Sequence, residues 1–138
     1  MSYEANKMQT ITYEYDFAVD GGAVGAIELR PLVANALEAG LVVTECVLDI
    51  ETTLASGSGS ATVGDADDAD GFFVDLVAAT GVQSSFGTLG GAYQRASVTD
   101  VESKVLKKIL ADKPILLTVG TGALTAGKFK LTFVVVKA

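Results

Sequence analysis

The chain has 138 residues, of which 49% are apolar and 20% are charged. This length and composition are typical of one globular domain with a sizeable core and exclude an intrinsically disordered protein. The net charge of −7 argues against binding to a nucleic acid backbone, and no apolar run is long enough to cross a bilayer. We therefore expect no nucleic acid and no membrane among its partners. The first residues lack the basic and apolar regions of a signal peptide, so we expect synthesis in a cytoplasm.

The N-terminal part of the chain predicts an arm followed by a strand. We interpret residues 1–9 as a flexible N-terminal arm and residues 10–138 as one β-sandwich domain. Residues 10–19 alternate strictly between polar and apolar side chains, which is typical of a strand with one buried face. The apolar face of this strand carries Ile11, Tyr13, Tyr15, Phe17 and Val19.

Two further strands are predicted before residue 55. The first covers residues 27–32 and should lie at a sheet edge, because Pro31 has no N–H group to donate. Residues 34–40 predict one helical turn. The longest strand covers residues 41–54, and its apolar face is predicted to carry Val42, Cys46, Leu48, Ile50 and Leu54.

The middle of the chain is rich in loops. A serine–glycine loop at 56–60 precedes a short strand at 61–64 and an acidic loop at 65–71. Residues 72–79 fit a helical turn or a strand equally well, and the pattern leaves both open. Residues 81–95 form a long, glycine-rich excursion.

The C-terminal part predicts a hairpin that organises the fold. Residues 99–110 fit a capped helix or a strand, and we favour the strand. Strands at 115–119 and 129–135 are joined by a small-residue loop at 121–127, which we interpret as a hairpin. The sum is an all-β chain with seven or eight strands and little helix, a β-sandwich or jelly-roll-like single domain. Its predicted core includes Leu48, Ile50, Leu117, Phe129, Leu131 and Phe133.

The sequence offers few groups for catalysis. It has no histidine, which removes serine–histidine and cysteine–histidine nucleophile pairs and the commonest zinc ligand. The lone cysteine, Cys46, lies on the apolar face of a strand and is interpreted as a buried, inert thiol. We therefore expect a protein that is not an enzyme and has no catalytic residue, metal ligand or cofactor.

Two loops resemble ligand sites and are interpreted structurally. Residues 122–128 have the spacing of a phosphate-binding loop, but Phe129 replaces the magnesium-binding hydroxyl and a strand follows. The acidic loop from Asp65 to Asp70 could bind calcium through its carboxylates, but it does not fit the EF-hand template. We favour a solvated loop and leave a weak calcium site as the alternative.

Two sets of side chains could serve carbohydrates. Tyr13 and Tyr15 could form a sugar-binding platform, although aromatic residues on an inward face are more often core. Glu45 and Glu51 could flank a glycosidic bond, although alternation on an exposed face explains them without catalysis. We favour the structural interpretation of both sets.

Charge is divided unevenly along the chain. Residues 1–102 contain 16 acids and 3 bases, whereas residues 103–138 contain 7 bases and 1 acid. Opposite charges could meet across one sheet or stay solvated, and they could also steer neighbouring subunits together. We favour the first interpretation and expect the surplus of apolar residues to serve subunit contacts.

Three stretches resemble small structural proteins of tailed bacteriophages, in particular the head decoration, or cement, proteins. They are VVTECVLDIETTL at 42–54, SATVGDADDADGFF at 60–73 and LADKPILLTVGTGALTAGKFKL at 110–131. The resemblance implies a β-sandwich or jelly-roll subunit, often trimeric, on the outer surface of the virion head. It brings no catalytic residues, and the first 40 residues match nothing in the family.

The resemblance implies a virion protein that binds the major capsid protein and stabilises contacts between capsid subunits. The expected contact site is the N-terminal arm, with Tyr3, Met8 and Ile11. The alternative is another virion structural protein, in a tail or fibre, that binds glycans of the host surface.

Overall fold

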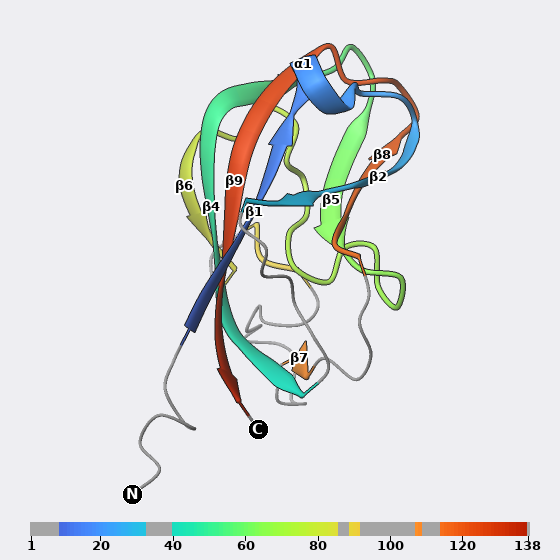
Figure 1. The fold of residues 1–138 in the computed structure, drawn as a ribbon. Helices are drawn as coiled ribbons and strands as arrows, with labels where there is room; N and C mark the ends of the chain where they lie inside the picture. The colour runs from blue at the N-terminus through green and yellow to red at the C-terminus, as the bar shows by residue number, and fades with distance from the viewer. Residues whose placement is uncertain (1–8, 33–39, 86–88, 92–106, 109–113, 138) are drawn as a thin grey trace, which may run out of the picture.

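The computed structural model describes residues 9–32, 40–85, 89–91, 107–108 and 114–137. It confirms an all-β fold in which two antiparallel sheets face each other as a sandwich (Figure 1). The arm predicted at 1–9 lies outside the described residues, except for Gln9, which begins the first strand.

The larger sheet has six strands. It contains β1 (Gln9–Asp16), β3 (Arg30–Pro31), β4 (Leu41–Ala55), β6 (Gly81–Ser84), β7 (Lys107–Lys108) and β9 (Ala126–Lys137). Their order is β3-β1-β9-β4-β6, and β7 also pairs with β4. The long strands β4 and β9 form its centre. Proline places β3 at an edge, as predicted from Pro31.

The smaller sheet has three strands in the order β2-β8-β5. These are β2 (Gly25–Glu28), β5 (Ser60–Gly64) and β8 (Leu116–Gly120). The chain crosses from this sheet to the larger one directly after β2, where Leu29 is still bonded to Ile115 and Arg30 already pairs with Glu14.

The core fills the space between the two sheets and is centred on aromatic side chains. Phe133 of β9 meets the Tyr13 ring edge-on at 5.7 Å between centroids and the Phe72 ring at 4.9 Å. These contacts follow from alternation, which turns every second side chain of β1 and β9 inward. All six predicted core residues are buried, which confirms the assigned faces: Leu48, Ile50, Leu117, Phe129, Leu131 and Phe133.

The predicted C-terminal hairpin is wrong. The two strands have the expected faces, but β8 pairs with β2 and β5, whereas β9 lies between β1 and β4. The connection passes from one sheet to the other. In this connection the Leu124 amide donates to the Gly22 carbonyl and the Thr125 amide to the Ala55 carbonyl. The connection is thus held by the loop at 21–24 and the end of β4, and not by pairing between β8 and β9.

The first strand is shorter than predicted. It ends at Asp16, whose side chain accepts a 3.0 Å hydrogen bond from the Ala18 amide and caps a one-turn helix, α1 (Phe17–Asp20). The turn removes the later residues from the strand register. Val19 is therefore 67% exposed and not part of the buried face.

Irregular pairing also changes one face of β4. Strict alternation predicts Val42 inside, but a register shift between Val43 and Glu45 turns Leu41 and Val43 inward instead. Cys46 is buried, as predicted.

The segments with ambiguous patterns have mixed outcomes. Residues 72–79 form neither a helix nor a regular strand. Single bridges at Phe73 and Val77 and further backbone hydrogen bonds connect them to β4 and β5. Part of the glycine-rich excursion forms β6. Within 99–110 the described part, β7, is extended, and the rest lies outside the described residues, as does the helical turn predicted at 34–40 except for Gly40.

Candidate functional site

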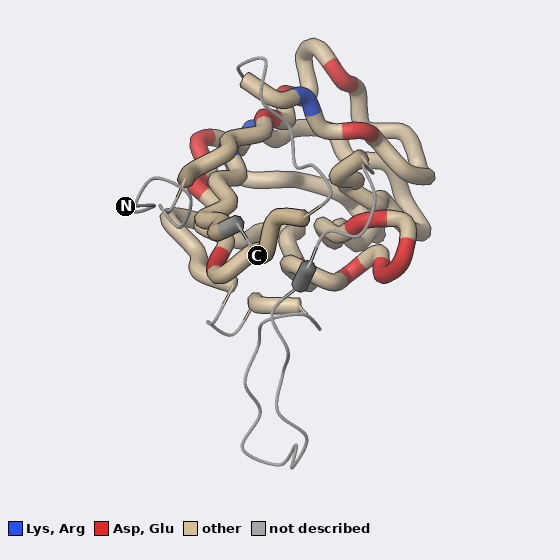
Figure 2. Tube along the Cα trace, turned by 60° about the horizontal axis from the view of Figure 1, so that its bottom comes forward, with Lys and Arg blue, Asp and Glu red and all other residues tan. Residues whose placement is uncertain are grey.

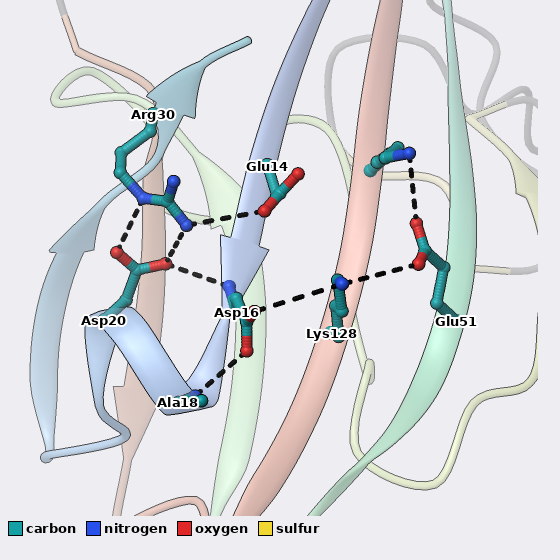
Figure 3. Close-up of polar contacts among 8 residues, drawn as sticks. Glu14, Asp16, Ala18, Asp20, Arg30, Glu51 and Lys128 are labelled. Carbon is teal, nitrogen blue, oxygen red and sulfur yellow. Dashed lines mark hydrogen bonds and ion pairs between the residues drawn. The ribbon is translucent and has the colours of Figure 1, made fainter.

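A network of charged side chains covers one end of the outer face of the larger sheet. Arg30 donates to Asp20 through Nε at 2.9 Å and through Nη2 at 3.1 Å, and it lies 3.6 Å from Glu14 (Figure 3). Asp20 also accepts the amide of Asp16 at 2.9 Å. One carboxylate thus connects α1, β1 and β3.

The environment of Asp20 favours its charged form. Burial would raise its pKa, but the hydrogen bonds from Arg30 and from the Asp16 amide, together with the Arg30 charge, lower it below the usual value. The same hydrogen bond raises the pKa of Arg30. The pair is a structural clamp that stays ionised at neutral pH.

The second half of the network crosses from β1 to β4. Lys128 of β9 lies 4.0 Å from Asp16 and 3.8 Å from Glu51, and Lys130 lies 3.5 Å from Glu51. Opposite charges therefore meet across this sheet, which is one of the two structural alternatives favoured from the sequence. Lys128 is the lysine of the phosphate-loop spacing, and its position between two carboxylates leaves that motif without a cation for phosphate.

Acidic residues dominate the charged surface that the structure describes. Figure 2 shows acidic segments around the rim of the molecule and few basic ones, which lie close to acidic neighbours.

The acidic loop is held by its own first carboxylate. Asp65 is buried, and its Oδ1 accepts the amides of Asp67 and Asp68, both at 3.1 Å. Among the described residues, no group of three or more acidic or cysteine side chains is arranged to hold a metal ion. The loop geometry is thus explained by a turn in which Asp65 bonds to the backbone.

The residues considered for carbohydrate binding are buried or hydrogen-bonded within the protein. Tyr13 and Tyr15 are buried in the core, so they form no exposed platform. The Tyr15 hydroxyl donates to the Gly21 carbonyl at 2.6 Å, and burial, followed by the charges of Asp20 and Asp16, raises its pKa to about 12. Glu45 accepts from Ser84 at 3.1 Å.

Cys46 is a core residue. Its amide donates to the Ser85 hydroxyl at 2.9 Å, and burial raises the pKa of its thiol far more than that hydroxyl lowers it. The thiol is therefore held in its unreactive protonated form.

Three uncharged loops close one end of the sandwich, at the top of Figure 1, and we call this surface the loop end: residues 21–24, 56–59 and 121–125. The loops pack with little clearance. A Cβ atom on Gly22 would lie 2.5 Å from the Leu124 carbonyl oxygen, and one on Gly59 would overlap the carbonyl of Gly122. The Ser56 hydroxyl donates to the Ala123 carbonyl at 3.0 Å. Glycine at these positions makes the loop end compact and well determined.

The loop end and the adjoining α1 expose apolar side chains. Val19 and Val24 are 67% and 57% exposed, and the preceding residues Ala18 and Ala23 are exposed as well. Ala123, in the loop at 121–125, is also exposed. Sequence reasoning missed this surface, although the uncharged run GGAVGAI at 21–27 was a usable signal. Of the predicted contact residues, Ile11 is 4% exposed in the core, whereas Tyr3 and Met8 lie outside the described residues.

Comparisons with known proteins find likeness in fold only. No family model matches the chain, and no curated protein matches it in sequence. A chain in the capsid asymmetric unit of cyanophage Pam1 superposes with a TM-score of 0.60 and 14% identity, covering 97% of this chain and 87% of that one. A chain in the acidic stable capsid structure of Helicobacter pylori bacteriophage KHP30 gives 0.57 and 15%, covering 95% and 89%. Both chains are therefore close to this one in length as well as in fold.

The described residues contain no helix that is long and apolar enough to span a membrane.

Proposed function

We propose that the protein is a structural component of a phage virion, specifically a decoration protein that binds the outer surface of the head and stabilises contacts between capsid subunits. The observation that carries the proposal is the fold likeness to two phage capsid chains over nearly the whole of each chain. The three sequence stretches that resemble decoration proteins support it independently. The protein would be made in the host cytoplasm and would act without catalysis.

The major capsid protein is the proposed partner, and many copies would act together. The resemblance implies a homotrimer, in which several weak contacts to the head add up to firm attachment. Two surfaces can make these contacts. One is the N-terminal arm with Tyr3 and Met8, and the other is the loop end together with the adjoining α1, where Val24 and Val19 expose apolar area.

The decisive experiment measures binding to expanded heads and retention of packaged DNA. Purified protein is mixed with expanded heads, with unexpanded precursors and with DNA alone, and bound protein is separated by sedimentation. We expect binding to expanded heads only, and release of DNA at a higher temperature from decorated particles. Identical release curves without any binding to heads would overturn the proposal and favour a tail or fibre protein, which a glycan-binding assay would then test.

Two variants distinguish the contact surfaces. Deletion of residues 1–8 removes the arm, and Val19→Glu adds a charge to α1 beside the loop end. Val82→Glu is the matched control, because Val82 is 67% exposed like Val19 but lies on β6 in the larger sheet. The surface that contacts the capsid is the one whose variant stays folded and loses binding while the control binds normally.

A further inference from the structure

The two edge strands of the smaller sheet differ in whether other residues cover their outer side. At the outer edge of β5, the carbonyl of Ala61 accepts the Leu76 amide at 3.0 Å, and Val63 bonds in both directions with Phe73. Residues 72–76 therefore cover this edge and satisfy its backbone groups. The opposite edge is formed by β2, which has no described strand beyond it.

The backbone groups on the outer side of β2 can be assigned from its pairing. The Leu29 amide bonds to Ile115 at 2.9 Å, and Leu29 continues the register in which Ile27 opposes Leu117. Because backbone groups alternate between the two sides of a strand, Ala26 and Glu28 direct their N–H and C=O groups away from β8. Neither residue makes a backbone hydrogen bond to any described residue on that side, and both are exposed.

Among the described residues, this edge has little protection against pairing. An exposed edge is normally blocked by proline, charged side chains, a bulge, a covering segment or its own shortness, and β2 has only its length of four residues and Glu28. The edge strand β3 contains Pro31, and β5 is covered by residues 72–76. The edge strands β2 and β6 contain no proline and no basic residue, and β2 is paired without a register shift. The chain from Gly21 to Ile27 is also free of charge, in a protein whose net charge is −7.

We propose that β2 is a docking strand for the β2 of a second copy, paired antiparallel about a two-fold axis. With Ala26 of each strand opposite Glu28 of its partner, the outward N–H and C=O groups of both residues form four hydrogen bonds. Two identical edges complement each other under this symmetry. The uncharged run lets two acidic chains approach without the repulsion that the rest of the surface would impose.

The position of Glu28 predicts how the contact responds to salt. In this register the two Glu28 side chains are diagonal neighbours, with Cα atoms about 7–8 Å apart. They repel each other, and salt screens this repulsion because the Debye length at 0.15 M is about 8 Å. Pairing through only four residues is weak, so the association should depend strongly on concentration.

The test is sedimentation velocity on the full chain over a wide concentration range. Ala26→Pro removes an outward N–H group that makes no backbone hydrogen bond to any residue that the structure describes, and Ala26→Thr, the matched control, keeps it. We expect the wild type and Ala26→Thr to double the mass of the species that Ala26→Pro forms, whether that species is a monomer or a trimer. The dissociation constant should rise about ten- to a hundredfold in Ala26→Pro. Equal association of the two variants would overturn the proposal.

A measurement without substitution covers the case in which Ala26→Pro does not fold. Amide hydrogen exchange at Ala26 and Glu28 should slow as concentration rises, whereas exchange at Val82, which faces outward from β6, should not change. Glu28→Gln should tighten association at low salt and reduce its salt dependence. Concentration-independent exchange at Ala26 and Glu28 would overturn the proposal. Neither result depends on heads, so failure of capsid binding and failure of β2 pairing are observed separately.

Discussion

The two sheets of the sandwich differ in the length of their strands, in the side chains on their faces and in their edge strands. The larger sheet is built on the long strands β4 and β9, carries the aromatic core on one face and a network of ion pairs on the other, and ends at one edge in a proline strand. The smaller sheet has strands of four and five residues and an aliphatic inner face, and it leaves β2 open. The larger sheet thus contributes the aromatic core and the ion pairs, and the smaller one contributes the edge that we propose to pair.

The largest expected effect comes from the aromatic centre of the larger sheet. Phe133→Ala removes a ring that contacts Tyr13 and Phe72 and leaves a cavity between the sheets. We expect a loss of about 3–5 kcal/mol in the free energy of unfolding, measured by urea denaturation. Val82→Ala, at an exposed site of the same sheet, should change stability by less than about 0.5 kcal/mol. A small loss in Phe133→Ala would contradict the assignment of the core to this sheet.

The second largest loss of stability is expected from substitutions at the loop end, where loops connected to both sheets meet. Gly59→Ala places a methyl group against the carbonyl of Gly122 and the Ser56 hydroxyl, so we expect a loss of about 1–3 kcal/mol. A methyl group on Gly57, two residues earlier, would meet no atom within 4 Å, so Gly57→Ala should change stability by at most about 1 kcal/mol. Thermal denaturation of the pair tests this difference, and equal effects would show that the loops can separate at little cost.

The Tyr15 hydroxyl should contribute a smaller amount. Tyr15→Phe removes its hydrogen bond to Gly21 and should cost about 0.5–1.5 kcal/mol at neutral pH. Because folding raises the pKa of Tyr15 from about 10 to about 12, its contribution is complete below pH 10 and is lost as the pH rises toward 12. Denaturation of both proteins across this range should show a steeper alkaline loss in the wild type. Parallel curves would contradict the buried, neutral hydroxyl.

The clamp between Asp20 and Arg30 should have the smallest effect. Arg30 is 41% exposed in its side chain, so Arg30→Gln should cost less than about 1 kcal/mol at neutral pH. Folding lowers the pKa of Asp20, so its contribution is present above the ordinary value of about 3.9 and is lost as the pH falls below it. NMR titration should show that the pKa of Asp20 is higher in Arg30→Gln, and an unchanged titration would exclude Arg30 as its cause.

Alternation predicted which side chains are buried, but it did not predict which strands are neighbours. The faces of Leu117 and Phe133 follow from local periodicity, whereas their placement in different sheets depends on loop contacts such as that between Leu124 and Gly22. Val42 and Val19 were misassigned because a register shift and an aspartate cap interrupt the alternation. Both interruptions arise from pairing and capping, which the period-two pattern does not contain.

The candidate surfaces were predictable only in part. The absence of histidine and the buried Cys46 follow from the sequence and its strand pattern, as does the core position of Tyr13. The loop end brings together three segments separated by more than 30 residues. That β2 is an uncovered edge, whereas β5 is a covered one, follows from the strand order and the hydrogen bonds of β5. Such surfaces depend on tertiary arrangement and leave only a run of uncharged residues in the sequence.

The central position of β9 has a consequence for how the protein is made. Strand β9 lies between β1 and β4, so each of these long strands pairs with residues 126–137, which the ribosome adds after all other described strands. The larger sheet cannot close during translation before this segment emerges, because more than 100 residues separate β1 from β9 along the chain. Contacts so distant along the chain are associated with slow folding. Until then β1 and β4 lack the strand that pairs with both of them, and apolar faces left exposed in this way favour aggregation.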